Sequence, residues 1–360
     1  MSQATEEAVL EQLRNINDPD LNKDIVTLGF VKDLKIDGGD VSFRIVLTTP
    51  ACPVKEEFKN QATDLVSSID GVSSVNVTMD AEVPQGRGVS NNVAIPGVKN
   101  IIAVSSGKGG VGKSTVAVNL AVALSQDGAK VGLMDADVYG PNIPMMFGVS
   151  AQPEIGPGNK LIPLEGHGVK LISMAFLVPP DKPMILRGPM LHGVVRQFLS
   201  DVDWGELDYL IVDMPPGTGD VQLSLAQLVP VQGAILVTTP QNVSLSDVTR
   251  ALKMFEQVAI PVLGVIENMS YFVPPDMPDK RYNIFGEGGG RRFADTHGIP
   301  FLGEVPLGME VREGGDLGKP VVMSHPDSPQ TEAFKNVAKT VAQQISIEAM
   351  KPELVIMSKA

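Results

Sequence analysis

Cysteine is almost absent from the sequence, since Cys52 is the only one among 360 residues. A single thiol excludes an intrachain disulfide and is typical of a reducing compartment. Long hydrophobic runs are missing too, because no apolar stretch reaches the roughly 18 residues that a membrane-spanning helix needs. The first residues, MSQATEEAVLEQL, are acidic and lack the positively charged start of a signal peptide. These absences predict a cytoplasmic protein.

Positive charge is also scarce. The chain has 29 Lys and Arg against 42 Asp and Glu, which gives a formal net charge of −13. Such an average surface repels nucleic acid and anionic membranes at long range, although a local basic patch would escape this average. The tail MKPELVIMSKA has few cations and no clear amphipathic pattern for a membrane surface. We therefore expect neither nucleic acid nor membrane as a partner.

The chain lacks an internal repeat, and its length accommodates a large core with a smaller companion domain. Residues 1–82 predict a small α+β domain, with helices at 4–15 and 54–68 and strands at 25–36, 41–48 and 72–79. Residues 83–98, VPQGRGVSNNVAIPGV, combine Pro, Gly, Ser and Asn, which is typical of an exposed linker.

Residues 99–350 alternate apolar runs with helical patterns. The expected strands are IIAVSS, VGLMD, VKLISMA, DYLIVDM, GAILVTT and PVLGVIEN. Runs that are apolar throughout fit strands buried on both faces, with helices as right-handed crossovers. The pattern predicts an α/β fold with a doubly wound, mostly parallel sheet, a final helix at 328–347 and a loose tail at 351–360.

The segment SSGKGGVGKST at residues 105–115 follows an expected strand and precedes an expected helix. This is the setting that the G-x-x-x-x-G-K-[ST] phosphate-binding loop requires, because glycines let backbone N–H groups face the phosphates at a helix N-terminus. Lys113 should contact the β and γ phosphates, and the Ser114 hydroxyl should bind Mg²⁺. The residues expected to bind ATP here are Gly107, Lys108, Gly109, Gly110, Val111, Gly112, Lys113, Ser114 and Thr115.

Two expected strands end in carboxylates. Asp135 and Asp137 follow VGLM, and Asp213 ends YLIVD. Open parallel sheets bind ligands beyond the carboxyl ends of their strands, so these side chains should lie beside the phosphate loop. We assign Asp137 to the attacking water and Asp213 to Mg²⁺, partly through water, while Asp135 could share the metal. Capping of a local turn is the alternative for each of the three.

Asn268 follows the expected strand PVLGVIE, so it should also lie at this edge of the sheet. Its amide can both donate to and accept from the adenine edge, or it can cap a turn. Gly217 and Gly219, in PPGTGD, would let their loop sense the γ phosphate and move after hydrolysis.

The loop sequence resembles that of the MinD, ParA and nitrogenase iron-protein class, whose deviant Walker A motif has a signature lysine at the position of Lys108. The resemblance implies a homodimer in which Lys108 of each subunit reaches the nucleotide of the other. That lysine would stabilise charge on the transferred phosphoryl group, as an arginine finger does. A solvated loop lysine is the alternative.

The motifs GKGGVGKST, DADVYGPNIP, DMPPGTGD, TTPQ and ENMSYF together resemble the Mrp/ApbC family of iron–sulfur cluster carrier ATPases. DPDLNKDIVTLGFV and LTTPACPV in the first domain are similar to the SufT-like domain that precedes many of these ATPases. The resemblance implies ATP-dependent cluster binding, delivery to apoproteins and contacts with iron–sulfur assembly proteins.

The sequence departs from that family after NMSYF, where such carriers commonly have a C-x-x-C pair and this chain reads VPPDMPDKRYNIFG. Neither Asp276 nor Asp279 replaces a soft thiolate ligand of iron. Cys52 is then the one possible protein thiolate, and a position near a helix N-terminus would favour its ionised form. A small buried residue is the alternative for Cys52. The four scattered histidines, His167, His192, His297 and His325, are expected to be ordinary surface or core residues.

Three functions follow from these patterns. The first is an ATP-hydrolysing iron–sulfur carrier, in which nucleotide switches the dimer between two geometries. The second is a MinD- or ParA-like positioning ATPase. The third is an ATP-gated scaffold that binds no metal, which the missing cysteines favour.

Overall fold

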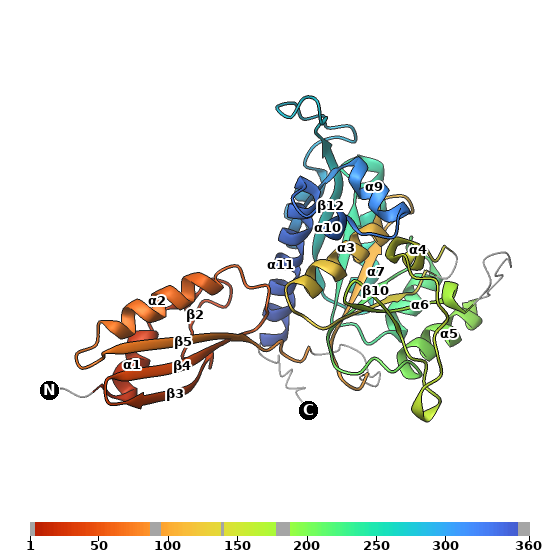
Figure 1. The fold of residues 1–360 in the computed structure, drawn as a ribbon. Helices are drawn as coiled ribbons and strands as arrows, with labels where there is room; N and C mark the ends of the chain where they lie inside the picture. The colour runs from red at the N-terminus through yellow and green to blue at the C-terminus, as the bar shows by residue number, and fades with distance from the viewer. Residues whose placement is uncertain (1–3, 87–94, 138–139, 178–187, 352–360) are drawn as a thin grey trace, which may run out of the picture. The chain divides into compact units, whose positions relative to one another are not determined.

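The structure of the chain, a computed structural model, describes residues 4–86, 95–137, 140–177 and 188–351 (Figure 1). Internal contacts divide the chain into two compact units, Met1–Pro84 with Ala342–Ala360, and Gln85–Val341. The last helix, α11 (Pro329–Met350), begins in the larger unit, and its final turns are grouped with the smaller one. The predicted linker at 83–98 and tail at 351–360 lie partly outside the described residues, so these boundaries stay predictions.

The smaller unit packs two helices on one face of a three-stranded sheet of order β3-β4-β5. β3 and β4 are antiparallel, whereas β4 and β5 are parallel. β4 reads DVSFRIVL and buries every second residue, which is the period-two pattern of a strand with one covered face. The elements are α1 (Glu6–Leu13), β1 (Asn17–Asp18), β2 (Lys23–Asp24), β3 (Val31–Asp37), β4 (Asp40–Leu47), α2 (Lys55–Ser67) and β5 (Ser74–Ala81).

The strand predicted at 25–36 is wrong in its first half. Residues 25–29 form turns, because the Asp24 side chain accepts hydrogen bonds from the backbone N–H groups of Val26 and Thr27 at 3.1 and 2.7 Å. An aspartate that bonds the backbone two and three residues ahead stabilises a turn against an extended chain. Ile25 and Phe30 are nevertheless buried, so the apolar pattern reports the core and not a strand.

The larger unit is built on an eight-stranded sheet of order β13-β12-β11-β6-β10-β7-β9-β8. All neighbouring pairs are parallel except β8 and β9, so the predicted doubly wound α/β fold is confirmed. The central strands are buried along their whole length, which explains their continuous apolar runs. The strands are β6 (Val98–Ser106), β7 (Val131–Asp135), β8 (Leu164–Gly166), β9 (Val169–Ser173), β10 (Leu207–Asp213), β11 (Gly233–Thr238), β12 (Val262–Phe272) and β13 (Phe301–Leu307).

Helices cover both faces of this sheet. One face carries α3, which contacts α4 and α10, and the other carries α5–α8 around a hydrophobic core that includes Phe198, Trp204 and Phe255. The chain passes from β10 to β11 across β6, so the carboxyl ends of β6, β7 and β10 meet where the direction of winding changes. The helices are α3 (Lys113–Gln126), α4 (Ile143–Phe147), α5 (Gly188–Ser200), α6 (Asp220–Leu228), α7 (Asn242–Gln257), α8 (Gly289–His297), α9 (Met309–Asp316) and α10 (Val321–Ser324).

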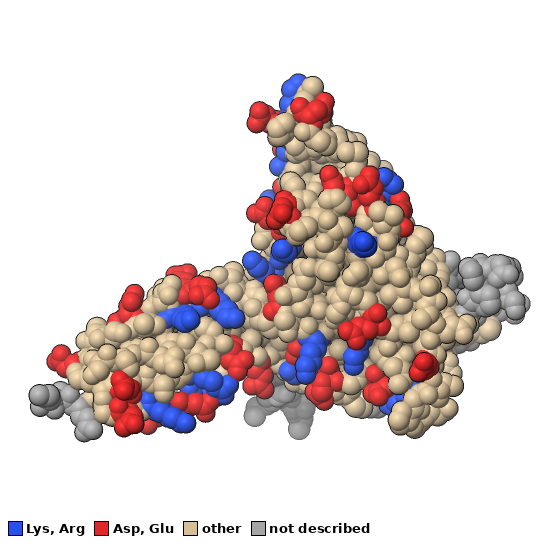
Figure 2. Space-filling model, viewed as in Figure 1, with Lys and Arg blue, Asp and Glu red and all other residues tan. Residues whose placement is uncertain are grey.

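The charged residues are spread over the surface. Figure 2 shows acidic and basic side chains interspersed on the face in view. Among the described helices, none combines the length and the apolar character needed to cross a bilayer.

Candidate functional site

The glycine-rich loop connects the end of β6 at Ser106 with the start of α3 at Lys113. Gly112 has φ of 81°, and a Cβ there would lie 2.1 Å from the Asn268 amide nitrogen. A Cβ on Gly107 would lie 2.2 Å from the backbone of Asp247 in α7. Glycine is therefore required at Gly112 by backbone conformation and close packing, and at Gly107 by close packing. The loop presents the N-terminus of α3, with its partial positive charge, at the edge of the sheet.

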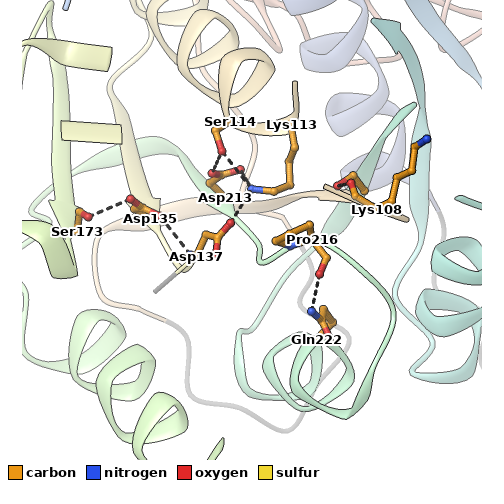
Figure 3. Close-up of polar contacts among 10 residues, drawn as sticks. Lys108, Lys113, Ser114, Asp135, Asp137, Ser173, Asp213, Pro216 and Gln222 are labelled. Atoms are coloured by element: carbon orange, nitrogen blue, oxygen red, sulfur yellow. Dashed lines mark hydrogen bonds and ion pairs between the residues drawn. The ribbon is translucent and has the colours of Figure 1, made fainter. Parts of the chain in front are cut away.

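Lys113, Ser114 and Asp213 form a polar cluster at this loop, in which Lys113 and Asp213 are buried and Ser114 is half-buried (Figure 3). Lys113 Nζ lies 2.6 Å from Asp213 Oδ1, and the Ser114 hydroxyl donates to Asp213 Oδ2 at 2.6 Å. The Lys113 and Asp213 side chains are 6% and 1% exposed. A pair this far from water must be closely matched, because each unpaired charge would carry a large desolvation cost.

Asp137 approaches the same lysine from β7. Its Oδ2 lies 3.9 Å from Lys113 Nζ, and it lines the cavity described below. Asp135 lies behind it and is buried, with the backbone N–H of Asp137 donating to Asp135 Oδ1 at 3.1 Å. Burial, and then the nearby charge of Asp213, raise the pKa of Asp135 well above its ordinary value.

Lys108 behaves differently from Lys113. Figure 3 shows the Lys108 side chain directed away from the carboxylates. Its backbone carbonyl accepts a hydrogen bond from the Ser106 hydroxyl at 2.9 Å, so the base of the turn is fixed while the side chain leaves the cluster.

The loop after β10 is tied to the phosphate loop. The N–H of Gly217 donates to the Ser106 carbonyl at 2.9 Å, and Gln222 in α6 donates to the Pro216 carbonyl at 2.6 Å. Pro216 lines the cavity, so a movement of this loop would alter the wall of the site.

A cavity of about 540 Å³ opens over these groups. This volume lies within the range of about 300–1,000 Å³ that is usual for ligand sites. It is lined by the glycine-rich loop and Asp137, by Met145 and Met146 from α4, and by residues between Pro306 and Asp316. A glycine-rich loop for phosphates and apolar side chains for a base together suit a nucleotide.

Asn268 lines the cavity and also holds the glycine-rich loop. Its Nδ2 donates to the Val111 carbonyl at 2.9 Å, and the residue is buried. The assignment of Asn268 to the adenine stays a prediction. The lining also includes Leu307 at the end of β13, next to the strand of Asn268, and Val311 and Arg312 in α9; these residues were not predicted because β13 was not recognised.

The segment that replaces C-x-x-C forms a closed projection, seen at the top of Figure 1. Phe272 and Tyr282 exchange two backbone hydrogen bonds of 2.9 and 2.8 Å, and Arg281 stacks 3.6 Å from the centre of the Tyr271 ring. Across the described part of the chain, no three or more His, Cys, Asp or Glu side chains are grouped to hold a metal ion.

Cys52 lies between β4 and α2 in the smaller unit and is half-buried. It lines a small cavity with Asp18, Asp20 and Thr49. Burial raises the pKa of the Cys52 thiol, and the charges of both aspartates act in the same direction. The expectation that a helix N-terminus favours the thiolate is therefore wrong, because desolvation exceeds the effect of the backbone.

We predict that iodoacetamide alkylates Cys52 of the folded protein more slowly than a free cysteine at pH 8. The rate should keep rising as pH passes about 8.5, the pKa of a free thiol, because the raised pKa delays formation of the reactive thiolate. The measurement is the rate of alkylation against pH, with the urea-unfolded protein as control. A folded-state rate that levels off at or below the pH found for the unfolded chain would contradict the assigned direction.

Comparisons with known proteins agree with this geometry. Residues 97–342 match the family described as NUBPL iron-transfer P-loop NTPase, and residues 6–79 match one described as iron-sulfur cluster assembly protein. An iron-sulfur cluster carrier protein from Synechocystis sp. is 54% identical over 350 residues, which are 96% of this chain and 99% of that protein. The protein of the same description from Deinococcus radiodurans is 48% identical over 345 residues, with coverages of 96% and 97%.

A solved structure is similar to the larger part of the chain. It is a nucleotide-binding protein from Archaeoglobus fulgidus in complex with ADP, with a TM-score of 0.59 and 38% identity. The match covers 67% of this chain and 93% of that one.

Proposed function

The chain belongs to the NUBPL iron-transfer P-loop NTPase family, and from this premise we propose that it hydrolyses ATP in order to bind iron–sulfur clusters and deliver them to apoproteins. The observation that carries the nucleotide part is the hydrogen-bonded cluster of Lys113, Ser114 and Asp213 at the glycine-rich loop. The cargo is inferred from the carrier proteins that share about half of its residues over nearly the whole length.

Mg²⁺ fits the oxygen atoms at this site. The Ser114 hydroxyl and the Asp213 carboxylate are hard ligands on adjacent strand and helix ends, and Mg²⁺ prefers such ligands with several waters retained. When bound, the ion would draw negative charge from the phosphates. Ser114 and Asp213 would hold it, and Asp213 would do so partly through water.

Lys113 and Asp137 have different roles in the proposed reaction. Lys113 provides a positive charge for the β and γ phosphates, and the N–H groups of the loop bind their oxygens. The Asp137 carboxylate accepts a hydrogen bond from the attacking water and so orients it toward the γ phosphorus.

In this proposal the adenine base is bound by a polar contact and by apolar contacts. Because Asn268 Nδ2 donates to the Val111 carbonyl, its amide oxygen is the atom suited to accept from the adenine amino group. Leu307 and Val311, which line the same cavity, offer apolar contact to the ring.

The direction of the Lys108 side chain supports a homodimer. Lys108 leads away from the carboxylates of its own subunit, as a residue would that acts at the nucleotide of a second copy. Formation of that dimer with ATP, and its opening after hydrolysis, would change the hold on the cargo. In this proposal the clients are apoproteins in the cytoplasm, and iron–sulfur assembly proteins are further partners. Neither nucleic acid nor a membrane is required.

The cluster cannot be enclosed by this chain alone. Iron–sulfur clusters take about four thiolate ligands, whereas the sequence has one cysteine and a homodimer has two. Further ligands must come from the client, from an assembly protein or from small thiols such as glutathione. Cys52 would provide the protein's own ligand, and metal binding would favour its deprotonation.

The test is anaerobic reconstitution of the wild type and Cys52→Ser with iron and sulfide, in the presence of glutathione. We expect bound iron, labile sulfide and visible absorbance in the wild type, followed by transfer to an apoferredoxin, and loss of all of these in Cys52→Ser. Ser67→Ala, at an exposed position of the same unit, is the matched control. If neither protein holds a cluster while both hydrolyse ATP, the chain is an ATP-gated scaffold.

A further inference from the structure

Three neighbouring strands end in a row of polar residues. Ser173, Asp135 and Asp213 are register partners across β9, β7 and β10. Side chains at matched positions of parallel strands lie side by side at the same edge. Asp213 and Asp137 have roles in the proposed reaction, whereas Asp135 and Ser173 have none so far.

Both oxygens of Asp135 are engaged. Oδ2 accepts from the Ser173 hydroxyl at 2.9 Å, and Oδ1 accepts from the Asp137 backbone N–H at 3.1 Å (Figure 3). Ser173 is itself anchored, because its hydroxyl oxygen accepts from the N–H of Ala175 at 3.2 Å. The carboxylate of Asp135 thus connects the end of β9 with the backbone of Asp137.

The backbone between the two aspartates is fixed as well. The N–H of Ala136 donates to the Asp213 carbonyl at 2.9 Å, so two successive N–H groups after β7 have partners on neighbouring groups. This arrangement determines where the Cα of Asp137 lies and hence where its carboxylate can reach.

Asp135 does not line the cavity in which the nucleotide is proposed to bind. Its side chain is 1% exposed, and among the described residues that line the large cavity Asp137 is present and Asp135 is not. A residue in this position acts on the reaction through Asp137 and not by direct contact with nucleotide or metal.

We propose that Asp135, held by Ser173, is the positioning residue for Asp137 in the hydrolysis reaction, an inference that rests on the proposed function. A displacement of a reacting group by about 1 Å can lower a rate by about 10²-fold without a change in binding.

The test compares Asp135→Ala, Asp135→Asn and Ser173→Ala by kcat, KM for ATP and the Kd of a fluorescent ATP analogue. In Asp135→Ala we expect kcat to fall about 30-fold and KM and Kd to change by less than about twofold. Asparagine keeps an acceptor for the Asp137 N–H and a second polar atom for Ser173, so it should restore kcat to within about threefold of the wild type. Ser173→Ala should lie between these values and guards against a failure of Asp135→Ala to fold.

Several outcomes would overturn the inference. Asp135→Asn that is as slow as Asp135→Ala would show that the charge is needed, as in a metal ligand. A parallel rise in KM and Kd would show a binding role, and unchanged kcat in Asp135→Ala and Ser173→Ala would show no role. If the wild type itself does not hydrolyse ATP, the proposed function fails and this inference fails with it, whereas the other outcomes leave the proposed function standing.

Discussion

Replacement of Lys113 by alanine is expected to lower ATP hydrolysis by about 10³-fold and to weaken nucleotide binding, because one buried cation serves the phosphates. It has a second effect on the protein without nucleotide. Lys113 lies 2.6 Å from an Asp213 that is 1% exposed, and removing one partner of a buried ion pair costs about 3–5 kcal/mol. The free energy of unfolding should therefore fall as well.

The measurement pairs phosphate release with urea unfolding at the assay temperature. Lys99→Ala is the matched control, because Lys99 forms an ion pair with Asp208 at 2.9 Å at the opposite edge of the same sheet. This control pair is more exposed, so we expect a loss of only about 1 kcal/mol or less and unchanged hydrolysis. If Lys113→Ala is folded and hydrolyses ATP at the wild-type rate, the assignment of the phosphate site to this loop is contradicted.

Replacement of Asp137 by asparagine should separate hydrolysis from binding. The amide cannot take a proton from water and is a weaker acceptor, so we expect kcat to fall between about 10²- and 10⁴-fold. Nucleotide affinity should change little, because in the proposed site the loop and Lys113 bind the phosphates. If hydrolysis opens the dimer, this variant should also stay dimeric with ATP.

Single-turnover phosphate release and light scattering with ATP or ADP make this measurement. Asp208→Asn, on the same sheet and remote from the cavity, serves as control. Normal hydrolysis in Asp137→Asn would favour the alternative that Asp137 only caps the turn after β7. If Asp137→Asn loses nucleotide binding together with hydrolysis, Asp137 acts in binding the nucleotide and not in orienting the attacking water.

The phosphate loop and the carboxylates could be predicted because their signals are local or topological. Gly112 is needed for the backbone conformation of the loop, and the residues at the ends of β7 and β10 meet because the carboxyl ends of parallel strands lie at one edge of the sheet. The same rule could have found Ser173, since it ends the run VKLIS.

The cavity residues in β13 and α9 could not be predicted in this way. β13 reads FLGEVPL, and Gly303 and Pro306 interrupt the apolar run that identified the other strands. Its place at the edge of the sheet tolerates both residues. The thiol of Cys52 was misjudged for another reason, because burial depends on packing that no local motif contains.

The neck formed by Phe272 and Tyr282 separates the projection from the sheet below. Residues 273–281 leave and return through one pair of backbone hydrogen bonds, and Arg281 at their end contacts the strands below, stacking on Tyr271 and pairing with Glu304 at 3.4 Å. Doubling the length of such a loop costs only about 0.6 kcal/mol in closure entropy. The tip before Arg281 can therefore change in length and sequence, while Asn268, four residues before Phe272, keeps its hydrogen bond to the glycine-rich loop.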